Sequence, residues 1–127
     1  MQEKSGFTLI ELILVTVIIG ILAGTVTLSF RGRGEETRKT RAKADVERLM
    51  DAIDLYAIDH HDKYPKSLND LMTSERKYLR RMQKDPWGSP YQYKHPGAHD
   101  VYDVFSCGPD KSPNTADDIT SWQIEGE

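Results

Sequence analysis

A single carboxylate, Glu11, interrupts an apolar run near the N-terminus. Between residues 7 and 30 it is the only ionisable side chain. An ionised carboxylate surrounded by hydrocarbon costs about 3 kcal/mol and normally persists only where it has a partner or a function. We therefore predict that Glu11 is paired with a cation when this segment is packed among apolar neighbours.

Other residues that bind metals or act as nucleophiles form no recognisable motif. His60 and His61 lie in one expected loop and His95 and His99 in another, without the cysteines or the helical spacing of a zinc site. Cys107 is the only cysteine, which excludes an intramolecular disulfide and a multi-cysteine zinc site. Since we find no Ser/His/Asp signature, phosphate-binding glycine loop or pair of catalytic glutamates, we expect no enzymatic activity.

Charge is unevenly distributed along the chain. The net charge is −3 at pH 7, yet basic residues crowd residues 31–48 and acidic residues dominate from Asp85 to the end. This asymmetry favours head-to-tail contacts between copies, or contact of the basic stretch with anionic lipid headgroups. The alternative is that interleaved charges simply solvate a helix. The mildly acidic chain has no compact basic, aromatic-rich motif, so nucleic-acid binding is not expected.

The apolar run has the length and composition of a membrane-spanning helix. Its twenty-four residues, 7–30, are apolar on all sides apart from Glu11. They would rise about 36 Å as a helix, compared with about 30 Å for the hydrocarbon core of a bilayer. A cleavable secretory signal fits less well, because its apolar core is usually shorter. We predict a transmembrane or filament-core helix over residues 7–30.

An amphipathic pattern follows the apolar run. Apolar residues recur at steps of three and four, which predicts that the helix continues to about Ile58. Gly32 and Gly34 each cost about 1 kcal/mol relative to alanine in a helix, so we expect a flexible or unwound stretch there. The apolar positions of the second half are Ala42, Val46, Leu49, Met50, Ile53, Tyr56 and Ala57.

The C-terminal third shows the alternation of short strands. Residues 91–94 and 101–105 predict a β-hairpin with a long loop, and a third strand is expected to include Ile119 and Trp122. Large side chains should pack this sheet against the apolar face of the helix: Trp87, Tyr93, Val104, Phe105 and Trp122.

The N-terminal residues resemble the processing site of type IV pilins and of the pseudopilins of type II secretion. The motif is Lys4-Ser5-Gly6 followed by Phe7-Thr8-Leu9-Ile10-Glu11-Leu12. The resemblance implies that a prepilin peptidase cuts after Gly6, which makes residues 1–6 a leader, and methylates the new N-terminal Phe7. It also implies that Glu11 pairs with the N-terminal ammonium of a neighbouring subunit.

A second resemblance covers nearly the whole chain. Its blocks are Tyr64-Pro65, Asp85-Pro86-Trp87-Gly88-Ser89-Pro90-Tyr91-Gln92-Tyr93, Ser106-Cys107-Gly108-Pro109-Asp110 and Asp117-Asp118-Ile119-Thr120-Ser121-Trp122. They resemble the major pseudopilins of type II secretion, the general secretion pathway protein G family. This implies an α+β, pilin-like fold in which a long N-terminal helix packs on a small antiparallel sheet with a C-terminal loop. Residues 31–127 would form the periplasmic domain.

The same resemblance implies a structural role in protein secretion. Copies would polymerise into a periplasmic pseudopilus that drives folded proteins across the outer membrane. Expected partners are further copies, minor pseudopilins, the inner-membrane assembly platform, the prepilin peptidase and, before assembly, membrane lipid. The expected location is the bacterial inner membrane, with one span and a periplasmic C-terminal domain. The alternatives are a type IV or competence pilus subunit, and a membrane-tethered calcium-sensing module that keeps its full N-terminus.

The family resemblance further implies a calcium ion in the C-terminal loop. The corresponding positions are Asp110, Asp118 and Ser121, with Asp117 as an additional candidate. Calcium takes six to eight oxygen ligands, and carboxylates converging from an irregular loop repel one another unless a cation joins them. The alternative is that this acidic loop is merely solvated. The spacing is not that of an EF-hand.

Overall fold

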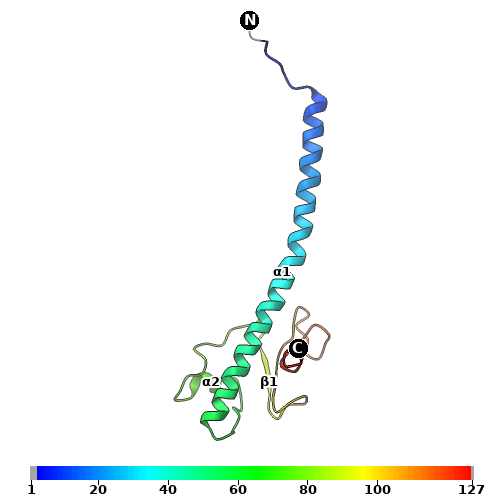
Figure 1. Ribbon diagram of the computed structural model, residues 1–127. Coiled ribbons are helices and arrows are strands. Elements are labelled where there is room, and N and C mark those ends of the chain that lie inside the picture. The colour runs from blue at the N-terminus through cyan, green and yellow to red at the C-terminus, as the bar shows by residue number, and fades with distance from the viewer. Residues whose placement is uncertain (1–2, 127) are drawn as a thin grey trace. The chain divides into compact units, whose positions relative to one another are not determined.

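The structure is a computed structural model that describes residues 3–126, with only the backbone described for residues 26–33. The chain divides into two compact units, the first ending at Glu36 and the second beginning at Thr37. The elements in chain order are α1 (Leu9–Asp59), α2 (Asp70–Thr73), β1 (Gln92–Lys94), β2 (Asp103–Ser106), β3 (Ile119–Thr120) and α3 (Ser121–Ile124) (Figure 1). This order confirms the predicted α+β class, a long N-terminal helix followed by a small antiparallel sheet.

Helix α1 differs from its prediction in two respects. It begins at Leu9 instead of Phe7, and it remains helical through Gly34, so the expected unwound stretch is absent from the described backbone. The apolar side chains from Leu9 to Leu22 are exposed all around the helix in the isolated chain. Within the described part of the chain, no helix is both long and apolar enough to cross a membrane.

The second half of α1 supplies one wall of the hydrophobic core. Ala42, Val46, Leu49, Ile53 and Ala57 are all buried, at the three- and four-residue spacing read from the sequence. Ile53 and Val46 are fully buried against Leu71 and Val104 in a single cluster. The predicted amphipathic face is therefore confirmed.

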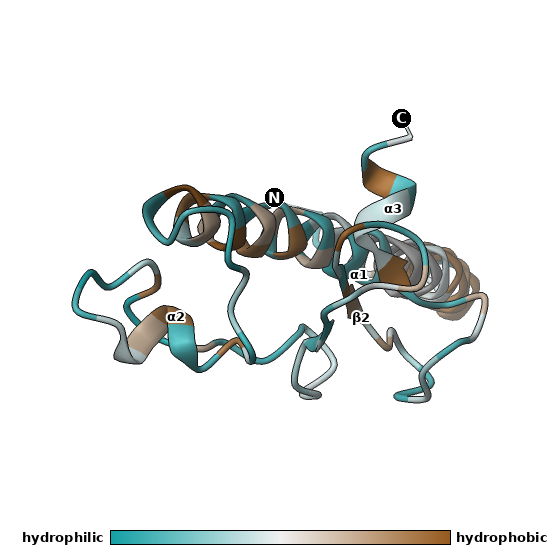
Figure 2. Ribbon diagram, turned by 90° about the horizontal axis from the view of Figure 1, so that it is seen from below, coloured by the Kyte–Doolittle hydropathy of each residue, from teal (hydrophilic) through white to brown (hydrophobic). Residues whose placement is uncertain are grey.

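The strands form one antiparallel sheet in the order β1-β2-β3. Tyr93 pairs with Val104 between β1 and β2, and Phe105 pairs with Thr120 between β2 and β3. The hairpin and the strand at Ile119 are thus confirmed. Apolar residues are prominent on β2 and on the helices, whereas the connecting segments are mostly hydrophilic (Figure 2).

Two of the expected core residues were placed wrongly. Trp122 lies in α3 instead of a strand, and neither it nor Phe105 belongs to the buried cluster. Successive side chains of a strand face opposite sides of a sheet, so the burial of Val104 in the core turns Phe105 away from it. Phe105 and Trp122 instead meet edge to face, with ring centroids 6.0 Å apart.

Two tyrosines tie the sheet region to α1. The Tyr91 hydroxyl donates to Asp45 Oδ2 at 2.8 Å, and the Tyr102 hydroxyl donates to Asp54 Oδ1 at 2.9 Å. Burial, followed by these bonds to carboxylates, raises the pKa of both tyrosines above the ordinary value. Both hydroxyls therefore stay protonated, and act as donors, throughout the physiological pH range.

Candidate functional sites

The predicted cleavage site lies before α1, in a segment without regular secondary structure. A Cβ atom placed on Gly6 would meet no other atom within 4 Å, and Phe7 is 84% exposed. Exposed, irregular chain near a terminus is the usual substrate of a peptidase. The peptide bond between Gly6 and Phe7 is accessible in this conformation.

Glu11 and Thr8 form a reciprocal capping box at the start of α1. Glu11 Oε2 accepts a hydrogen bond from the Thr8 backbone N–H at 2.9 Å, and Thr8 Oγ1 accepts one from the Glu11 backbone N–H at 3.3 Å. This arrangement explains why the helix begins at Leu9. The Thr-x-x-Glu spacing is the sequence signature of this capping role, which was not among our predictions. In the isolated chain, the Thr8 backbone N–H is a local donor to the Glu11 carboxylate.

Asp85 organises the turn that opens the Asp-Pro-Trp-Gly block. Its Oδ1 accepts hydrogen bonds from the backbone N–H groups of Trp87 at 3.1 Å and Ser89 at 2.8 Å. Its Oδ2 accepts one from the Ser106 hydroxyl at 2.7 Å, and Asp85 itself is buried. Gly88 sits in this turn with φ of +89°, a conformation that favours glycine. The block is therefore a carboxylate-centred turn joined to β2.

The hydrogen-bond network continues from Asp85 through Ser106 into the acidic loop, residues 108–118. Ser106 Oγ accepts a hydrogen bond from the Gly108 backbone N–H at 3.2 Å. Gly108 has φ of +69°, and the backbone of Asp117 occupies the space that a side chain there would need. Glycine is required at this position for both reasons. The acidic loop that starts at Gly108 therefore returns at Asp117, whose backbone packs against Gly108.

The predicted calcium ligands are engaged with donors of the protein. The carboxylate of Asp118 is buried and accepts hydrogen bonds from the Asn114 N–H at 2.8 Å and the Thr115 hydroxyl at 3.1 Å. Asp110 Oδ1 accepts one from the Ser112 N–H at 3.0 Å. The Ser121 hydroxyl oxygen accepts one from the Val104 N–H at 3.2 Å. Asp117 is exposed.

Residues 3–126 contain no group of three or more histidine, cysteine, aspartate or glutamate side chains that could hold a metal ion. The donors to the Asp118 carboxylate within the loop are the Asn114 N–H, the Thr115 N–H and the Thr115 hydroxyl. Calcium binding stays a prediction.

The histidines take part in ring stacking. His60 stacks on Tyr56 with centroids 3.9 Å apart, and its Nδ1 lies 2.8 Å from the Tyr56 carbonyl oxygen. His99 stacks on Trp122 at 3.8 Å, with its Nδ1 3.1 Å from Asp103 Oδ2. His95 stacks on Tyr64 with centroids 5.0 Å apart, so three of the four histidines have a structural role.

Asp103 fixes the long hairpin loop. Its buried carboxylate accepts hydrogen bonds from the backbone N–H groups of Ala98 at 2.8 Å, His99 at 3.2 Å and Asp100 at 3.3 Å. Burial opposes the ionisation of Asp103, but the hydrogen bonds from Ala98, His99 and Asp100 prevail and lower its pKa. The loop between β1 and β2 is therefore held in a defined conformation by an ionised side chain.

The N-terminal motif and the fold together define a class of protein. A long helix preceded by a processing motif, with its second half packed on a three-stranded antiparallel sheet, is the arrangement of a pilin-like subunit. Residues 1–27 match the family model described as the prokaryotic N-terminal methylation motif. Residues 30–122 match the model described as type II secretion system (T2SS), protein G. The chain belongs to the type II secretion protein G family.

Individual relatives agree with this assignment. The type II secretion system core protein G of Escherichia coli K12 is 38% identical, over 97% of this chain and 94% of that protein. The core protein G of Vibrio cholerae is 36% identical, over 98% of this chain and 96% of that protein. The crystal structure of the major pseudopilin of enterohaemorrhagic E. coli superimposes with a TM-score of 0.66 at 34% identity, covering 73% of this chain and 89% of that one.

Proposed function

We propose that this protein is a structural subunit that polymerises into the periplasmic pseudopilus of a type II secretion system and so drives export of folded proteins across the outer membrane. The observation that carries this proposal is the match of residues 30–122 to the protein G family. Its role is mechanical, and we infer no catalytic activity. A type IV or competence pilus subunit is the alternative, and loss of twitching or DNA uptake with normal secretion would favour it.

The proposed biogenesis begins with removal of residues 1–6. The methylation motif and the exposed Gly6–Phe7 bond support cleavage by a prepilin peptidase, followed by N-methylation of Phe7. The mature chain would then be a single-pass inner-membrane protein with a periplasmic C-terminal domain. The intact mass of the membrane-extracted protein tests this: loss of six residues plus one methyl group supports it, and retention of Met1 contradicts it.

The proposed assembly contact uses Glu11. Thr8 supplies one local backbone donor to the Glu11 carboxylate in the isolated chain. In the apolar surroundings of a packed filament, the ammonium of a neighbouring Phe7 would provide the compensating charge. We expect Glu11→Ala to insert in the membrane but to yield few cross-linked oligomers, whereas the exposed Glu47→Ala in the second half of α1 should assemble normally. Equal cross-linking of the Glu11 variant and the wild type would contradict this role.

Further proposed partners are minor pseudopilins, the inner-membrane assembly platform and, before assembly, membrane lipid, with no role for nucleic acid. Calcium binding is a separate proposal that rests on the resemblance and on three aspartates in one loop, Asp110, Asp117 and Asp118. Binding would require Asp118 to exchange the loop donors Asn114 and Thr115 for the cation.

A further inference from the structure

A stretch of α1 without acidic side chains lies at the start of the second unit. Residues 37–44, which we call the basic segment, contain no carboxylate and four cations: Arg38, Lys39, Arg41 and Lys43. All four are exposed. The wider stretch 31–48 holds seven basic and four acidic residues, so its excess of positive charge is concentrated in the basic segment. A local excess of this kind attracts anions.

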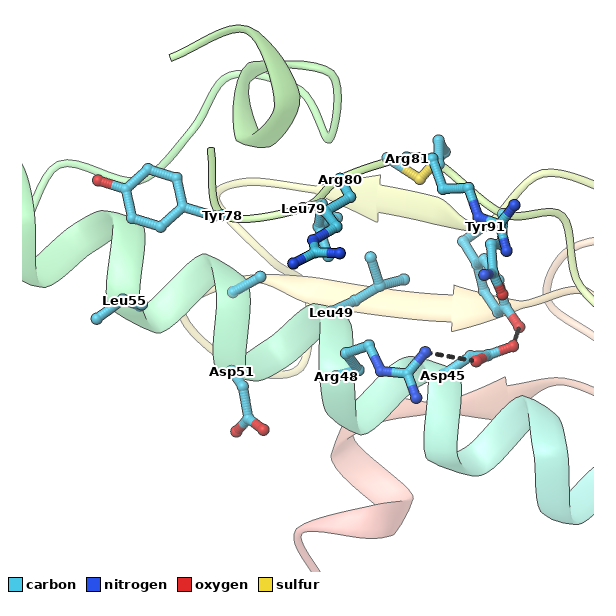
Figure 3. Close-up of a pocket in the computed structure, with 13 residues that line it drawn as sticks. Asp45, Arg48, Leu49, Asp51, Leu55, Tyr78, Leu79, Arg80, Arg81 and Tyr91 are labelled. Carbon is cyan, nitrogen blue, oxygen red and sulfur yellow. Dashed lines mark hydrogen bonds and ion pairs between the residues drawn. The ribbon is translucent and has the colours of Figure 1, made fainter. Parts of the chain in front are cut away.

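The acidic residue that follows the basic segment is shared among several groups. Asp45 Oδ2 accepts a hydrogen bond from the Tyr91 hydroxyl at 2.8 Å, and Asp45 Oδ1 lies 3.6 Å from Arg48 (Figure 3). Arg41 also approaches this carboxylate, with its Nε 3.8 Å from Oδ2 and 59% of its side chain exposed. Exposed ion pairs at this distance contribute little and are screened by salt. Arg41 therefore keeps most of its capacity to attract an external anion.

The basic segment also marks the end of the packed core along α1. Ala42 is fully buried, whereas Arg38, one turn earlier on the same face of the helix, is exposed. The buried face of α1 therefore begins between these two residues. Arg41 and Lys43 lie about 100° from Ala42 around the helix, on opposite sides of it. Lys39 lies one turn before Lys43. The cations thus point to several sides of α1 where it leaves the core.

This spread around the helix favours a lipid surface over a single protein partner. A helix that docks on another protein presents its contact residues as one stripe, at three- and four-residue spacing. A helix that leaves a bilayer is surrounded by headgroups, and the basic residues beside it attract anionic lipid from every side. The side chains of a helix also tilt toward its N-terminus. In α1 this is the direction of the apolar run, residues 7–30.

The apolar run is close to the basic segment along the chain. Six residues, 31–36, separate them, and six residues rise about 9 Å as a helix. The headgroup layer is about 5–8 Å thick on each side of a bilayer. The field of anionic lipids extends about 8 Å further, one Debye length at physiological ionic strength. With residues 7–30 in the hydrocarbon core, the basic segment lies within this field.

We propose that the basic segment binds the phosphate groups of anionic phospholipids before the subunit enters a filament. The contact rests on the proposed function and deepens it by naming the class of lipid and the residues that bind it. Each cation adds attraction without requiring a fixed partner, as is usual for basic segments beside a membrane span. The contact stabilises the subunit in the membrane and must be exchanged when the subunit is extracted.

Energy transfer from the basic segment to labelled lipid tests this contact. A donor dye is attached to the full-length protein through Thr40→Cys in a Cys107→Ser background. The protein is reconstituted in phosphatidylcholine vesicles that contain phosphatidylglycerol as the minor lipid, and the same acceptor dye is carried by one lipid or the other. We expect the local ratio of phosphatidylglycerol to phosphatidylcholine to exceed the bulk ratio about fivefold, equivalent to about 1 kcal/mol. Raising the ionic strength to about 1 M, where the Debye length is about 3 Å, should remove most of this excess.

Removal of charge identifies the residues that bind lipid. Arg38→Gln combined with Lys39→Gln should lower the enrichment to about twofold, since half of the attraction is lost. Arg38→Lys combined with Lys39→Arg keeps both charges and should leave the enrichment unchanged. The matched control is Lys63→Gln with Lys66→Gln, because both lysines are exposed and lie beyond the C-terminal end of α1. This control removes the same charge and should retain the full enrichment.

Three results would overturn the lipid contact, and they differ in what they imply for the proposed function. Equal energy transfer to both lipids, with a wild-type protein that alkaline carbonate does not release from cell membranes, leaves the proposed function intact. Release of the wild type by alkaline carbonate contradicts the proposed membrane span, and the lipid contact fails with it. Equal loss of enrichment in the control and in Arg38→Gln/Lys39→Gln would assign the attraction to net charge instead of the basic segment.

Discussion

Replacing Asp85 should destabilise the second unit more than replacing any exposed acidic residue. The carboxylate is buried and accepts three hydrogen bonds, from Trp87, Ser89 and Ser106. Each hydrogen bond to a charged group contributes about 1.5–3 kcal/mol. Water that enters the site of the removed carboxylate would replace part of the lost hydrogen bonding. We expect Asp85→Ala to lower the free energy of unfolding by about 3–5 kcal/mol. At about 4–8 °C per kcal/mol, the melting temperature should fall by about 12–40 °C.

Thermal unfolding of the full-length protein in detergent, followed by tryptophan fluorescence, measures this effect. Trp87 lies within the turn and reports it directly. Asp85→Asn keeps one carbonyl acceptor, so it should cost about 1–2 kcal/mol and fall between the wild type and Asp85→Ala. Glu47→Gln, an exposed change on α1, should stay within about 0.5 kcal/mol of the wild type. A loss of less than about 1 kcal/mol for Asp85→Ala would show that these three hydrogen bonds do not stabilise the unit as we expect.

Four further predictions concern the hairpin and the acidic loop. Asp103 has a folded pKa below its ordinary 3.8, so its stabilisation is complete above about pH 4 and is lost as the pH falls through the folded value. Acid titrations of Asp103→Asn should therefore show a shallower loss of stability below pH 4 than the wild type. Burial raises the pKa of Cys107, so its reaction with a thiol reagent should be slow until unfolding. Gly108→Ala should destabilise by about 2–4 kcal/mol in urea unfolding, because its φ is positive and the Asp117 backbone leaves no space. Millimolar calcium should raise the melting temperature of the wild type relative to chelator, and Asp118→Asn should abolish this rise; an equal melting temperature with and without calcium contradicts the calcium proposal.

The elements that could be predicted were those with a local, periodic pattern. Burial of Val46, Leu49 and Ile53 follows from three- and four-residue spacing within one helix, which needs no knowledge of the partner surface. The hairpin around β1 and β2 follows from short alternation on either side of a proline- and glycine-containing loop. These patterns depend only on neighbours in sequence.

The placement of Phe105 and Trp122 could not be predicted from local sequence patterns. Which face of β2 turns inward depends on its contact with α1, and the burial of Val104 decides the outcome for its neighbour. Trp122 reads equally well as the end of a strand or as the start of a helical turn. Its position on α3, against the exposed side of Phe105, is set by tertiary packing.

The same distinction between local patterns and long-range contacts applies to the candidate sites. The Thr8–Glu11 capping box has a readable signature, but the apolar surroundings of Glu11 pointed to a distant partner instead. Asp85 belongs to the block that resembles the family, yet its hydrogen-bond donor Ser106 is distant in sequence. Hydrogen bonds between residues that are distant in sequence could not be predicted from sequence motifs.

We infer that this chain serves protein secretion as a pseudopilus subunit. The most direct test is the location of secreted enzymes in a strain that lacks the gene, with and without a plasmid copy. We expect exoproteins to accumulate in the periplasm of the deletion strain and the plasmid to restore their export. Normal export in the deletion strain, accompanied by loss of twitching or DNA uptake, would contradict it and assign the protein to a pilus.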